Sequence, residues 1–280
     1  MLAKHLIKPV EGQDFVRLPS GVIRIGRPFD NLIEPYTEAD IPDFLSAADH
    51  TLAIEKRKKY EKMLRAETNE FYDLVGKLAA AGRSVIFVFQ GRDSAGKSGA
   101  IERIVQAIDY DFKNFMWVTI GKPTDEEKQH PFLWRFGIGD RVPKHGQVRA
   151  FDRSWNERLL VEVVDKLASK EDLMASYAQV RAYEWLRRQE GAIFVKVWMD
   201  ITYDEQGERF KQRKAEKPRK STDADEDARG KWDKYTIAAN EMFFRTGTDF
   251  APWYLVSSED KRYSRVTVLQ LANQLIRADL

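Results

Sequence analysis

A glycine-rich stretch with one lysine and one serine is the part of the chain whose residue types indicate chemistry most directly. Its sequence is GRDSAGKS, from Gly91 to Ser98, and it lies between the apolar run SVIFVFQ and a helical pattern. Such a loop turns backbone N–H groups toward phosphate oxygens, while Lys97 supplies a positive charge and Ser98 a hydroxyl for Mg²⁺. The helix that follows directs its positive end at the same anion. We therefore predict a phosphate site; the alternative is a strand-to-helix turn that contains a lysine by chance.

Two acidic residues stand where a metal ion would be needed. Asp152 and Arg153 follow the apolar run VRAF, and a carboxylate at the end of a neighbouring strand is where a phosphate-loop enzyme holds Mg²⁺. Asp152 could instead cap the helix that begins near Trp155. Asp93 lies inside the loop, where it should repel phosphates unless a cation intervenes. Asp93 therefore binds a metal, or takes part in acid/base or positioning work on an incoming oxygen nucleophile. The alternative is that it pairs with Arg92 or another cation.

A basic segment lies further along the chain. Between residues 209 and 220 the only acid is Glu216, and Pro218 ends the helix there. Its cations are Arg209, Lys211, Arg213, Lys214, Lys217, Arg219 and Lys220. A polyanion needs several cations along its length whereas one nucleotide needs few, so the segment suits a polymer of phosphate. A solvated basic helix face and a nucleic-acid patch are the alternatives.

The pattern of apolar residues predicts the elements that position these side chains. We expect strands at 84–90, 115–120, 148–152, 192–199 and 253–256. Helices are expected between them, at 98–108, 125–136, 157–168, 172–189, 204–215, 225–246 and 261–277. This alternation implies an α/β fold with a doubly wound, mostly parallel five-stranded sheet and helices on both faces. Ligands bind beyond the carboxyl ends of such strands, where the loop at Gly91 lies.

The first part of the chain shows weaker patterns. Residues 1–40 have no sustained period and are predicted to form an N-terminal arm that lies on the domain and carries little chemistry. Apolar positions over residues 41–81 suggest a helix that is broken once near His50. We expect residues 41–280 to form a single domain, because a doubly wound sheet commonly reaches this size.

Composition sets limits on the class of protein. The chain has 280 residues, of which 43% are hydrophobic and 32% charged, with a formal net charge of +2. No run approaches the roughly 20 apolar residues of a membrane span, and the N-terminus lacks the apolar core of a signal peptide. We therefore expect a cytoplasmic protein without membrane or nucleic-acid partners. The absence of cysteine excludes disulfides and thiolate metal sites.

Five blocks of the chain together resemble the polyphosphate kinase 2 family. In chain order they are GRDSAGKSGAIERI, GKPTDEEKQHPFLWR, FDRSWNERLLVE, KWDKYTIAANEMFFRT and APWYLVSSEDKRYSRV. The resemblance implies a thymidylate-kinase-like P-loop fold with a helical lid at about residues 205–232. It also implies transfer of the terminal phosphoryl group between inorganic polyphosphate and a nucleoside mono- or diphosphate. The transfer would depend on Mg²⁺, with Mn²⁺ as a substitute, and would form no covalent enzyme intermediate.

The residue chemistry and the resemblance together assign roles to individual positions. Asp93, Lys97, Asp152 and Arg153 are expected to be catalytic, and Asp93 and Asp152 to hold the metal. Phosphate or polyphosphate binding is expected from Gly91, Ala95, Gly96, Ser98, Arg103, Arg135, Arg209, Arg213, Lys217 and Lys220. Nucleotide binding is expected from Trp155, Asn156 and Glu157. Core packing is the alternative for Trp155.

The chain departs from the usual pattern of the family at three places. Ser98 stands where members usually have glycine, and Asn156 and Glu157 follow Trp155 where many have Tyr-Asn-Arg. The lid contains RKSTD at residues 219–223 instead of Trp-Lys-Leu-Ser-Pro. The alternatives are therefore an ATP-dependent P-loop kinase of a small molecule and a regulator that binds nucleotide or polyphosphate without turnover. The GKPTDEEKQHPFLWR block and Glu157 resemble the subgroups of the family that accept nucleoside monophosphates more than the subgroup that accepts only diphosphates. We also expect a homo-oligomer, because the arm and the helix before Ala81 offer surface for one.

Overall fold

A seven-stranded sheet in the order β1-β2-β7-β6-β3-β5-β4 forms the centre of the molecule. The computed structural model describes residues 15–28, 41–108, 114–167, 169–216, 227 and 229–280. The strands are β1 (Phe15–Arg17), β2 (Ile23–Ile25), β3 (Ser84–Gly91), β4 (Phe115–Thr119), β5 (Val148–Asp152), β6 (Ala192–Asp200) and β7 (Trp253–Ser257). The run from β7 to β4 is parallel and contains the five strands predicted from the sequence. The predicted α/β class is therefore confirmed.

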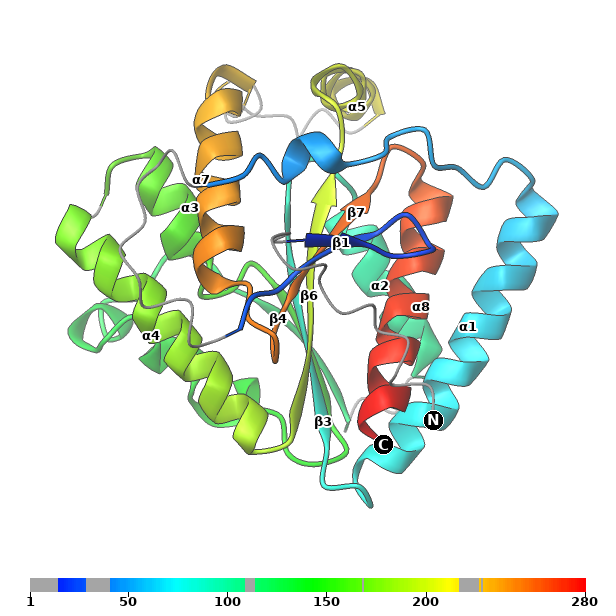
Figure 1. The fold of residues 1–280 in the computed structure, drawn as a ribbon, viewed down its shortest axis with the longest axis horizontal. Coiled ribbons are helices and arrows are strands. Elements are labelled where there is room, and N and C mark those ends of the chain that lie inside the picture. The colour runs from blue at the N-terminus through cyan, green and yellow to red at the C-terminus, as the bar shows by residue number, and fades with distance from the viewer. Residues whose placement is uncertain (1–14, 29–40, 109–113, 168, 217–226, 228) are drawn as a thin grey trace.

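Helices cover both faces of the sheet (Figure 1). One layer consists of α1 (Arg57–Leu78), α2 (Lys97–Ala107) and α8 (Lys261–Asp279). The other consists of α3 (Glu157–Val164), α4 (Lys170–Gln189) and α7 (Trp232–Thr246). A further helix, α5 (Tyr203–Glu216), lies beyond the end of β6 at the top of the view. The carboxyl ends of the parallel strands therefore point to the side of the molecule where α5 lies.

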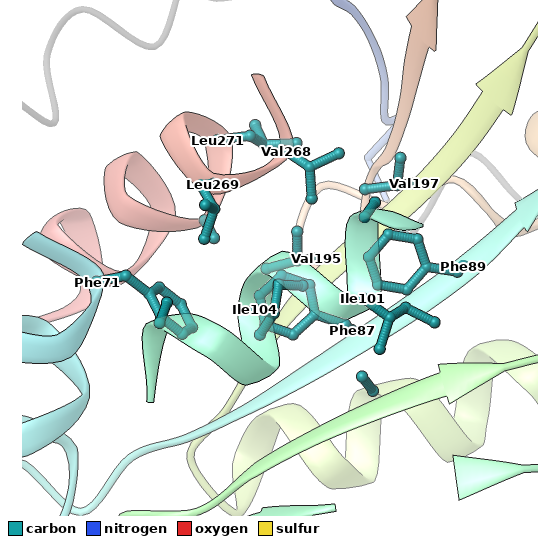
Figure 2. Close-up of a cluster of buried hydrophobic side chains, with 14 of the residues drawn as sticks. Phe71, Phe87, Phe89, Ile101, Ile104, Val195, Val197, Val268, Leu269 and Leu271 are labelled. Carbon is teal, nitrogen blue, oxygen red and sulfur yellow. The ribbon is translucent and has the colours of Figure 1, made fainter. Parts of the chain in front are cut away.

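The central strands are mostly apolar because both of their faces are buried. In β3, Phe87 and Phe89 belong to the core under α1, α2 and α8, whereas Ile86 and Val88 belong to the core under α3, α4 and α7. Successive side chains of a strand point to opposite faces, so the run fills two cores at once. Figure 2 shows the first core, in which Ile104 of α2 packs near Phe87.

Part of the predicted N-terminal arm belongs to the sheet. β1 pairs with β2, and β2 pairs with β7, both antiparallel. Ile23 and Ile25 have no exposed surface. The sheet therefore has seven strands where the sequence predicts five, because strands of three residues are too short to show a period of two.

The helix predicted at residues 125–136 is wrong. The structure has two short 3₁₀ turns there, η5 (Glu127–Gln129) and η6 (Trp134–Phe136). Pro131 lies between them and lacks a backbone N–H, and His130 before it has an extended backbone with ψ 159°. A proline forces this conformation on the preceding residue, so it interrupts a helix whatever the apolar spacing.

The segment from residue 41 to 56 also differs from the prediction. It contains only the 3₁₀ turn η4 (Leu45–Ala47), so the helix predicted over 41–81 is present from Arg57 onward, as α1. Tertiary contacts hold the segment in place: Phe44 is fully buried, and the Asn240 amide of α7 donates a 2.9 Å hydrogen bond to Asp43. These contacts override the helical spacing of the apolar residues, because local spacing is a weak determinant beside packing.

Candidate active site

The loop between β3 and α2 has the backbone conformation that a phosphate loop requires. Gly91 ends β3 with φ +141°, and a Cβ atom there would lie 2.2 Å from the carbonyl oxygen of Met199. Gly96 is the N-cap of α2 in the left-handed region, with φ 95°. Both positions exclude ordinary side chains, because of the close approach at Gly91 and the positive φ at each. The ammonium of Lys97 donates to the carbonyl oxygens of Gly91 and Arg92, each at 3.0 Å.

The end of β5 places a second group of charges beside this loop. Asp152 pairs in register with Phe89 of β3, the residue two positions before Gly91. It therefore lies on the strand adjacent to the start of the loop. Burial lowers the pKa of the Lys97 ammonium, and the carboxylates of Asp93 and Asp152 oppose that shift. Asp93 and Asp152 are therefore both within electrostatic reach of Lys97, and their catalytic roles stay a prediction.

Glu157 and Arg153 complete this charged group. Burial raises the pKa of the Glu157 carboxyl, and the positive charges of Arg153 and Lys97 oppose the rise. Arg153 has φ 69°, a left-handed conformation that is unfavourable for a residue with a side chain. The turn after β5 thus carries a strained arginine at the same edge of the sheet as the loop.

A serine ties this turn to β3. Ser154 Oγ accepts hydrogen bonds from Gln90 Nε2 at 3.3 Å and from the backbone N and the side-chain Nδ2 of Asn156, each at 3.2 Å. Asn156 is fully buried. The structure therefore places Asn156 inside the turn, where it supports the backbone, and gives its side chain no surface for a nucleotide.

Trp155 lies in the core, which was the alternative to nucleotide binding. It is 1% exposed, and its indole N–H donates to Glu184 Oε1 at 2.9 Å. Its ring packs edge-on against Phe151 and Tyr183. Of the three residues expected to bind the nucleotide, only Glu157 lies beside the charges of the loop.

The basic residues of α5 divide into two kinds. Arg209 is 6% exposed, and its guanidinium donates to the carbonyl oxygens of Ser94 at 3.0 Å, Ser258 at 2.7 Å and Glu259 at 2.9 Å. It braces the loop against the end of β7, so the expectation that it faces polyphosphate is not met here. Arg213 instead pairs with the loop acid Asp93 at 3.2 Å. Lys217 and Lys220 lie outside the described residues.

The other predicted phosphate ligands occupy separate places. Arg135 is 9% exposed and donates to the carbonyl oxygen of Gly121 and to Glu127, so its contacts lie within the loop after β4. Arg103 pairs with its neighbour Glu102 on α2. Ala95 is buried, and its carbonyl oxygen accepts a 2.6 Å hydrogen bond from Ser258 Oγ. Ser98 lies in the first turn of α2, next to Lys97.

Two charged residues near the loop were not singled out by the sequence. Arg92 was considered only as a partner of Asp93, but its Nε donates to Asp200 Oδ1 at 3.3 Å. Asp200 is the last residue of β6, and the Trp198 indole donates to the same oxygen at 3.0 Å. Asp200 stands at the end of an apolar strand, as Asp152 does, so the same sequence signal could have identified it.

The donor set of the site suits a metal that is shared with the substrate. Carboxylate oxygens of Asp93 and Asp152 are the hard donors that Mg²⁺ takes, one or two at a time, together with substrate phosphates. Asp93 has a half-exposed side chain, whose oxygens accept from the Ser94 N–H and from Arg213. Within the described ranges, no three His, Asp or Glu side chains come together as a protein-only metal site. The two aspartates therefore fit a magnesium ion, and metal binding itself stays a prediction.

The comparison with protein families decides the class of this site. The model of the family polyphosphate kinase 2 matches residues 54–279, from just before α1 to the end of α8. The chain belongs to the polyphosphate kinase 2 family. The match includes the loop, the β5 turn and α5, so the geometry described above is that of a polyphosphate kinase 2 domain.

Curated relatives carry names that specify reactions. The polyphosphate:AMP phosphotransferase of Pseudomonas aeruginosa is 38% identical over 221 residues, which cover 78% of this chain and 44% of that protein. ADP-polyphosphate phosphotransferase 3 of Rhizobium meliloti is 32% identical over 229 residues, which cover 81% of this chain and 79% of that protein. The chain spans about half the length of the polyphosphate:AMP phosphotransferases it matches.

Solved structures of polyphosphate kinase 2 proteins share the fold. A crystal structure from Pseudomonas aeruginosa assigned to this family superposes with a TM-score of 0.80 at 37% identity and covers 86% of this chain and 52% of that one. The polyphosphate kinase 2 of Arthrobacter aurescens gives a TM-score of 0.76 at 29% identity and covers 87% of this chain and 86% of that one.

None of the helices in the described part of the chain is both long and apolar enough to cross a bilayer.

Proposed function

We propose that this protein transfers a phosphoryl group between inorganic polyphosphate and a nucleoside mono- or diphosphate. The observation that carries the proposal is the convergence of Lys97, Asp93 and Asp152 at the adjoining ends of β3 and β5, in a chain of the polyphosphate kinase 2 family. Relatives named for polyphosphate and AMP, ADP or GDP support the substrate classes.

The residues of the site supply binding and charge. Backbone N–H groups of the loop and the Lys97 ammonium bind the phosphates, while Arg153 and Arg213 offset the negative charge that three equatorial oxygens share in a loose transition state. An acceptor phosphate oxygen bonds to the terminal phosphorus as the anhydride bond to the polymer breaks, and polyphosphate leaves one unit shorter. Mg²⁺ bound by Asp93 and Asp152, or Mn²⁺ in its place, would neutralise part of this charge.

Within this reaction, AMP is the acceptor that we propose. Three relatives that are 35–38% identical to the chain are named polyphosphate:AMP phosphotransferase. Glu157 supports the same choice: it lies within electrostatic reach of Lys97, and together with the GKPTDEEKQHPFLWR block it resembles the monophosphate-accepting subgroups. Homo-oligomeric assembly and a cytoplasmic location stay predictions, and sedimentation velocity tests the first of them.

An acceptor screen tests the proposed function. The purified protein is incubated with Mg²⁺ and long-chain polyphosphate, with AMP, ADP, GMP and GDP offered separately, and the products are separated by chromatography. We expect ADP from AMP, and no product when EDTA replaces Mg²⁺. Binding of polyphosphate without any product would support a regulator instead. ATP-dependent phosphorylation of a small molecule would support a conventional P-loop kinase, as Ser98 suggests.

A further inference from the structure

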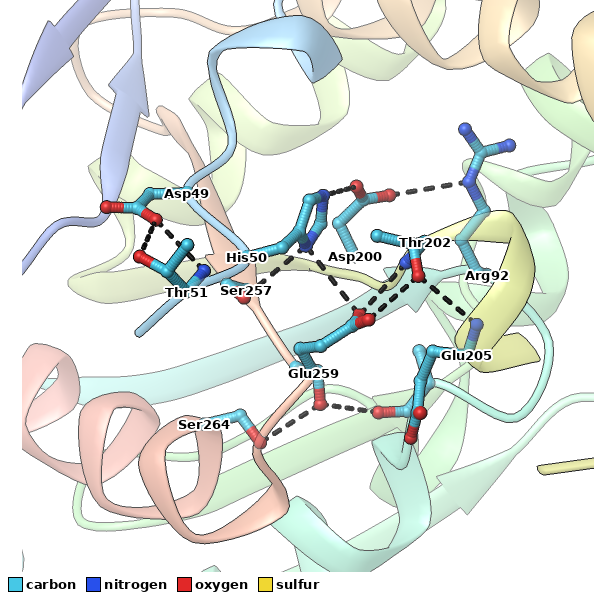
Figure 3. A network of polar contacts seen from close by, with 12 residues as sticks. Asp49, His50, Thr51, Arg92, Asp200, Thr202, Glu205, Ser257, Glu259 and Ser264 are labelled. Carbon is cyan, nitrogen blue, oxygen red and sulfur yellow. Dashed lines mark hydrogen bonds and ion pairs between the residues drawn. The ribbon is translucent and has the colours of Figure 1, made fainter. Parts of the chain in front are cut away.

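A chain of polar contacts runs from the segment before α1 into the phosphate loop (Figure 3). His50 Nε2 lies 3.3 Å from Asp200 Oδ2, and Asp200 Oδ1 accepts from Arg92 Nε at 3.3 Å. Arg92 belongs to the loop itself, and its backbone N–H donates to the carbonyl oxygen of Met199 at 3.2 Å. One carboxylate therefore connects a histidine far away in the sequence to the loop that binds phosphate.

Arg92 also fastens the loop to α7. Its guanidinium donates to Thr236 Oγ1 at 2.8 Å and to the carbonyl oxygen of Trp232 at 3.3 Å, and it lies 3.8 Å from the centre of the Trp232 ring. The side chains of Arg92 and Asp200 are each 5% exposed. Buried charges are stable only when paired with good geometry, so the Asp200 carboxylate helps to fix the position of Arg92 as its charged partner.

His50 determines the place of that carboxylate. Asp200 Oδ1 is already taken by Arg92 and by the Trp198 indole, whereas Oδ2 faces His50. On its other side, His50 Nδ1 lies 3.5 Å from Ser257 Oγ and 3.9 Å from Glu259 Oε2. The imidazole thus bridges the end of β6 and the end of β7, and without it the second oxygen of a buried carboxylate would lose this partner.

We propose that His50 is a positioning residue for phosphoryl transfer: it fixes Asp200 and, through Asp200, holds Arg92 and the start of the phosphate loop against α7. Its effect on turnover rests on the proposed function, whereas its effect on Arg92 does not. The contacts of His50 come from a segment that sequence analysis treated as helix and connected with no chemistry.

The direction of the pH effect follows from the charges around the ring. Asp200 on β6, Glu259 after β7 and Asp49 beside it all favour the cation, and the hydrogen bond with Asp200 raises the pKa of His50 above its usual 6.5 despite burial. The imidazolium pair with Asp200 is therefore complete below the raised pKa and is lost as the pH rises through it. Turnover should fall in the same range of pH.

Kinetics of two variants test the proposal, with His145→Ala as the matched control. His145 is an exposed histidine whose ring contacts the carbonyl oxygen of Glu190, far from the loop in the fold. We expect His50→Ala to lower kcat by about tenfold with little change in KM, because misplaced catalytic groups cost turnover more than binding. His50→Gln keeps a donor toward Asp200 without the charge, as the neutral imidazole does. Its kcat should therefore equal that of the wild type above the pKa of His50 at every pH, and it should lack the alkaline fall in kcat.

A spectroscopic measurement supplies a readout independent of activity. Because Arg92 stacks on Trp232, tryptophan emission of the wild type should change as His50 titrates, with a midpoint above pH 6.5, and Trp232→Phe assigns the signal. The change should be absent from His50→Gln. If the wild type has no transferase activity but its emission changes with pH and that of His50→Gln does not, only the proposed function is overturned.

Two results would overturn the positioning role. One is wild-type kcat in His50→Ala at every pH, and the other is an alkaline fall in kcat or an emission transition that persists in His50→Gln. If His50→Ala does not fold, as judged by circular dichroism, the comparison of His50→Gln with the wild type decides alone.

Discussion

Lys97 is the residue on which the proposed phosphate site depends most directly. Its ammonium lies over the loop, bonded to two carbonyl oxygens and flanked by Asp93 and Asp152. A phosphate bound in the loop would replace these contacts with stronger, charge-assisted ones.

Removing this charge should therefore abolish most of the transfer activity. We expect Lys97→Ala to lower kcat by at least about a hundredfold, the usual cost of one strong electrostatic contact to a transition state. The chromatographic assay with polyphosphate and AMP measures it. Lys77→Ala is the control, because Lys77 is an exposed lysine in the last turn of α1 and has no predicted role in the site. Equal losses in the two variants would contradict a specific role for Lys97.

Arg209 and Arg213 lie one turn apart on α5 and should behave differently. Arg209→Ala removes the donor to three carbonyl oxygens, at least one of them buried, and should cost about 2 kcal/mol or more in the free energy of unfolding. Arg213→Ala removes a partly exposed ion pair and should cost less than about 1 kcal/mol. Urea unfolding monitored by circular dichroism measures both. A larger loss of stability for Arg213→Ala would refute this division.

Single residues were predictable where a local motif carried them. Lys97 and Asp152 follow from the loop sequence and from the end of an apolar strand. The burial of Arg209 does not follow, because a basic run has the same sequence whether its arginines face water or reach carbonyl oxygens. His50 and Asp200 meet only when the sheet is assembled, and no spacing along the chain indicates their contact.

At the scale of elements, the turn after β5 shows how local strain and function coincide. Arg153 has φ 69° within a turn that Ser154, Gln90 and Asn156 hold by hydrogen bonds. A non-glycine residue in this region costs roughly 1 kcal/mol, so surrounding structure must maintain it.

Two substitutions separate the charge of Arg153 from its backbone. Arg153→Gly and Arg153→Ala both remove the guanidinium, so both should lose most of their turnover. The glycine variant should be about 1 kcal/mol more stable than the alanine variant, because only glycine adopts this φ without a steric cost. Urea midpoints of the two variants give the comparison. Identical midpoints would show that the turn relaxes when the side chain is removed.

Elements were predictable in proportion to how much of them is buried on both faces. The five parallel strands have long apolar runs, and all were found. The three-residue strands β1 and β2 have no such run, and Pro131 outweighs an otherwise helical pattern at residues 125–136. Residues 41–56 depend on contacts such as that of Asn240 with Asp43, which a local pattern does not encode.

At the scale of the whole molecule, one buried ion pair joins several elements. Lys196 of β6 donates to Glu184 of α4 at 2.7 Å and to the carbonyl oxygen of Thr246 in α7 at 2.9 Å, and both charged side chains are fully buried. Glu184 also accepts from the Trp155 indole, next to the turn after β5. The pair therefore links the packing of the second core to the edge of the site.

Breaking this pair should cost more than replacing it. Lys196→Met leaves Glu184 as an unpaired buried acid, and we expect a loss of about 3–5 kcal/mol in the free energy of unfolding. Adding Glu184→Leu should recover much of that loss. The recovery should be incomplete by about 1 kcal/mol, because the Trp155 N–H then lacks its acceptor. Urea unfolding of the single and double variants measures the difference. A double variant no more stable than Lys196→Met would contradict the account.

The position of β3 in the sheet has a consequence for hydrogen exchange. β3 is bonded to β6 on one side and to β5 on the other, so neither of its edges is free. Amide protons of such a strand exchange with solvent only when the whole domain opens. The pairing continues as far as Gly91, and the N–H of Arg92 is bonded to Met199. The phosphate loop thus begins where protection should be greatest, and the slowest-exchanging amides should lie next to the phosphate site.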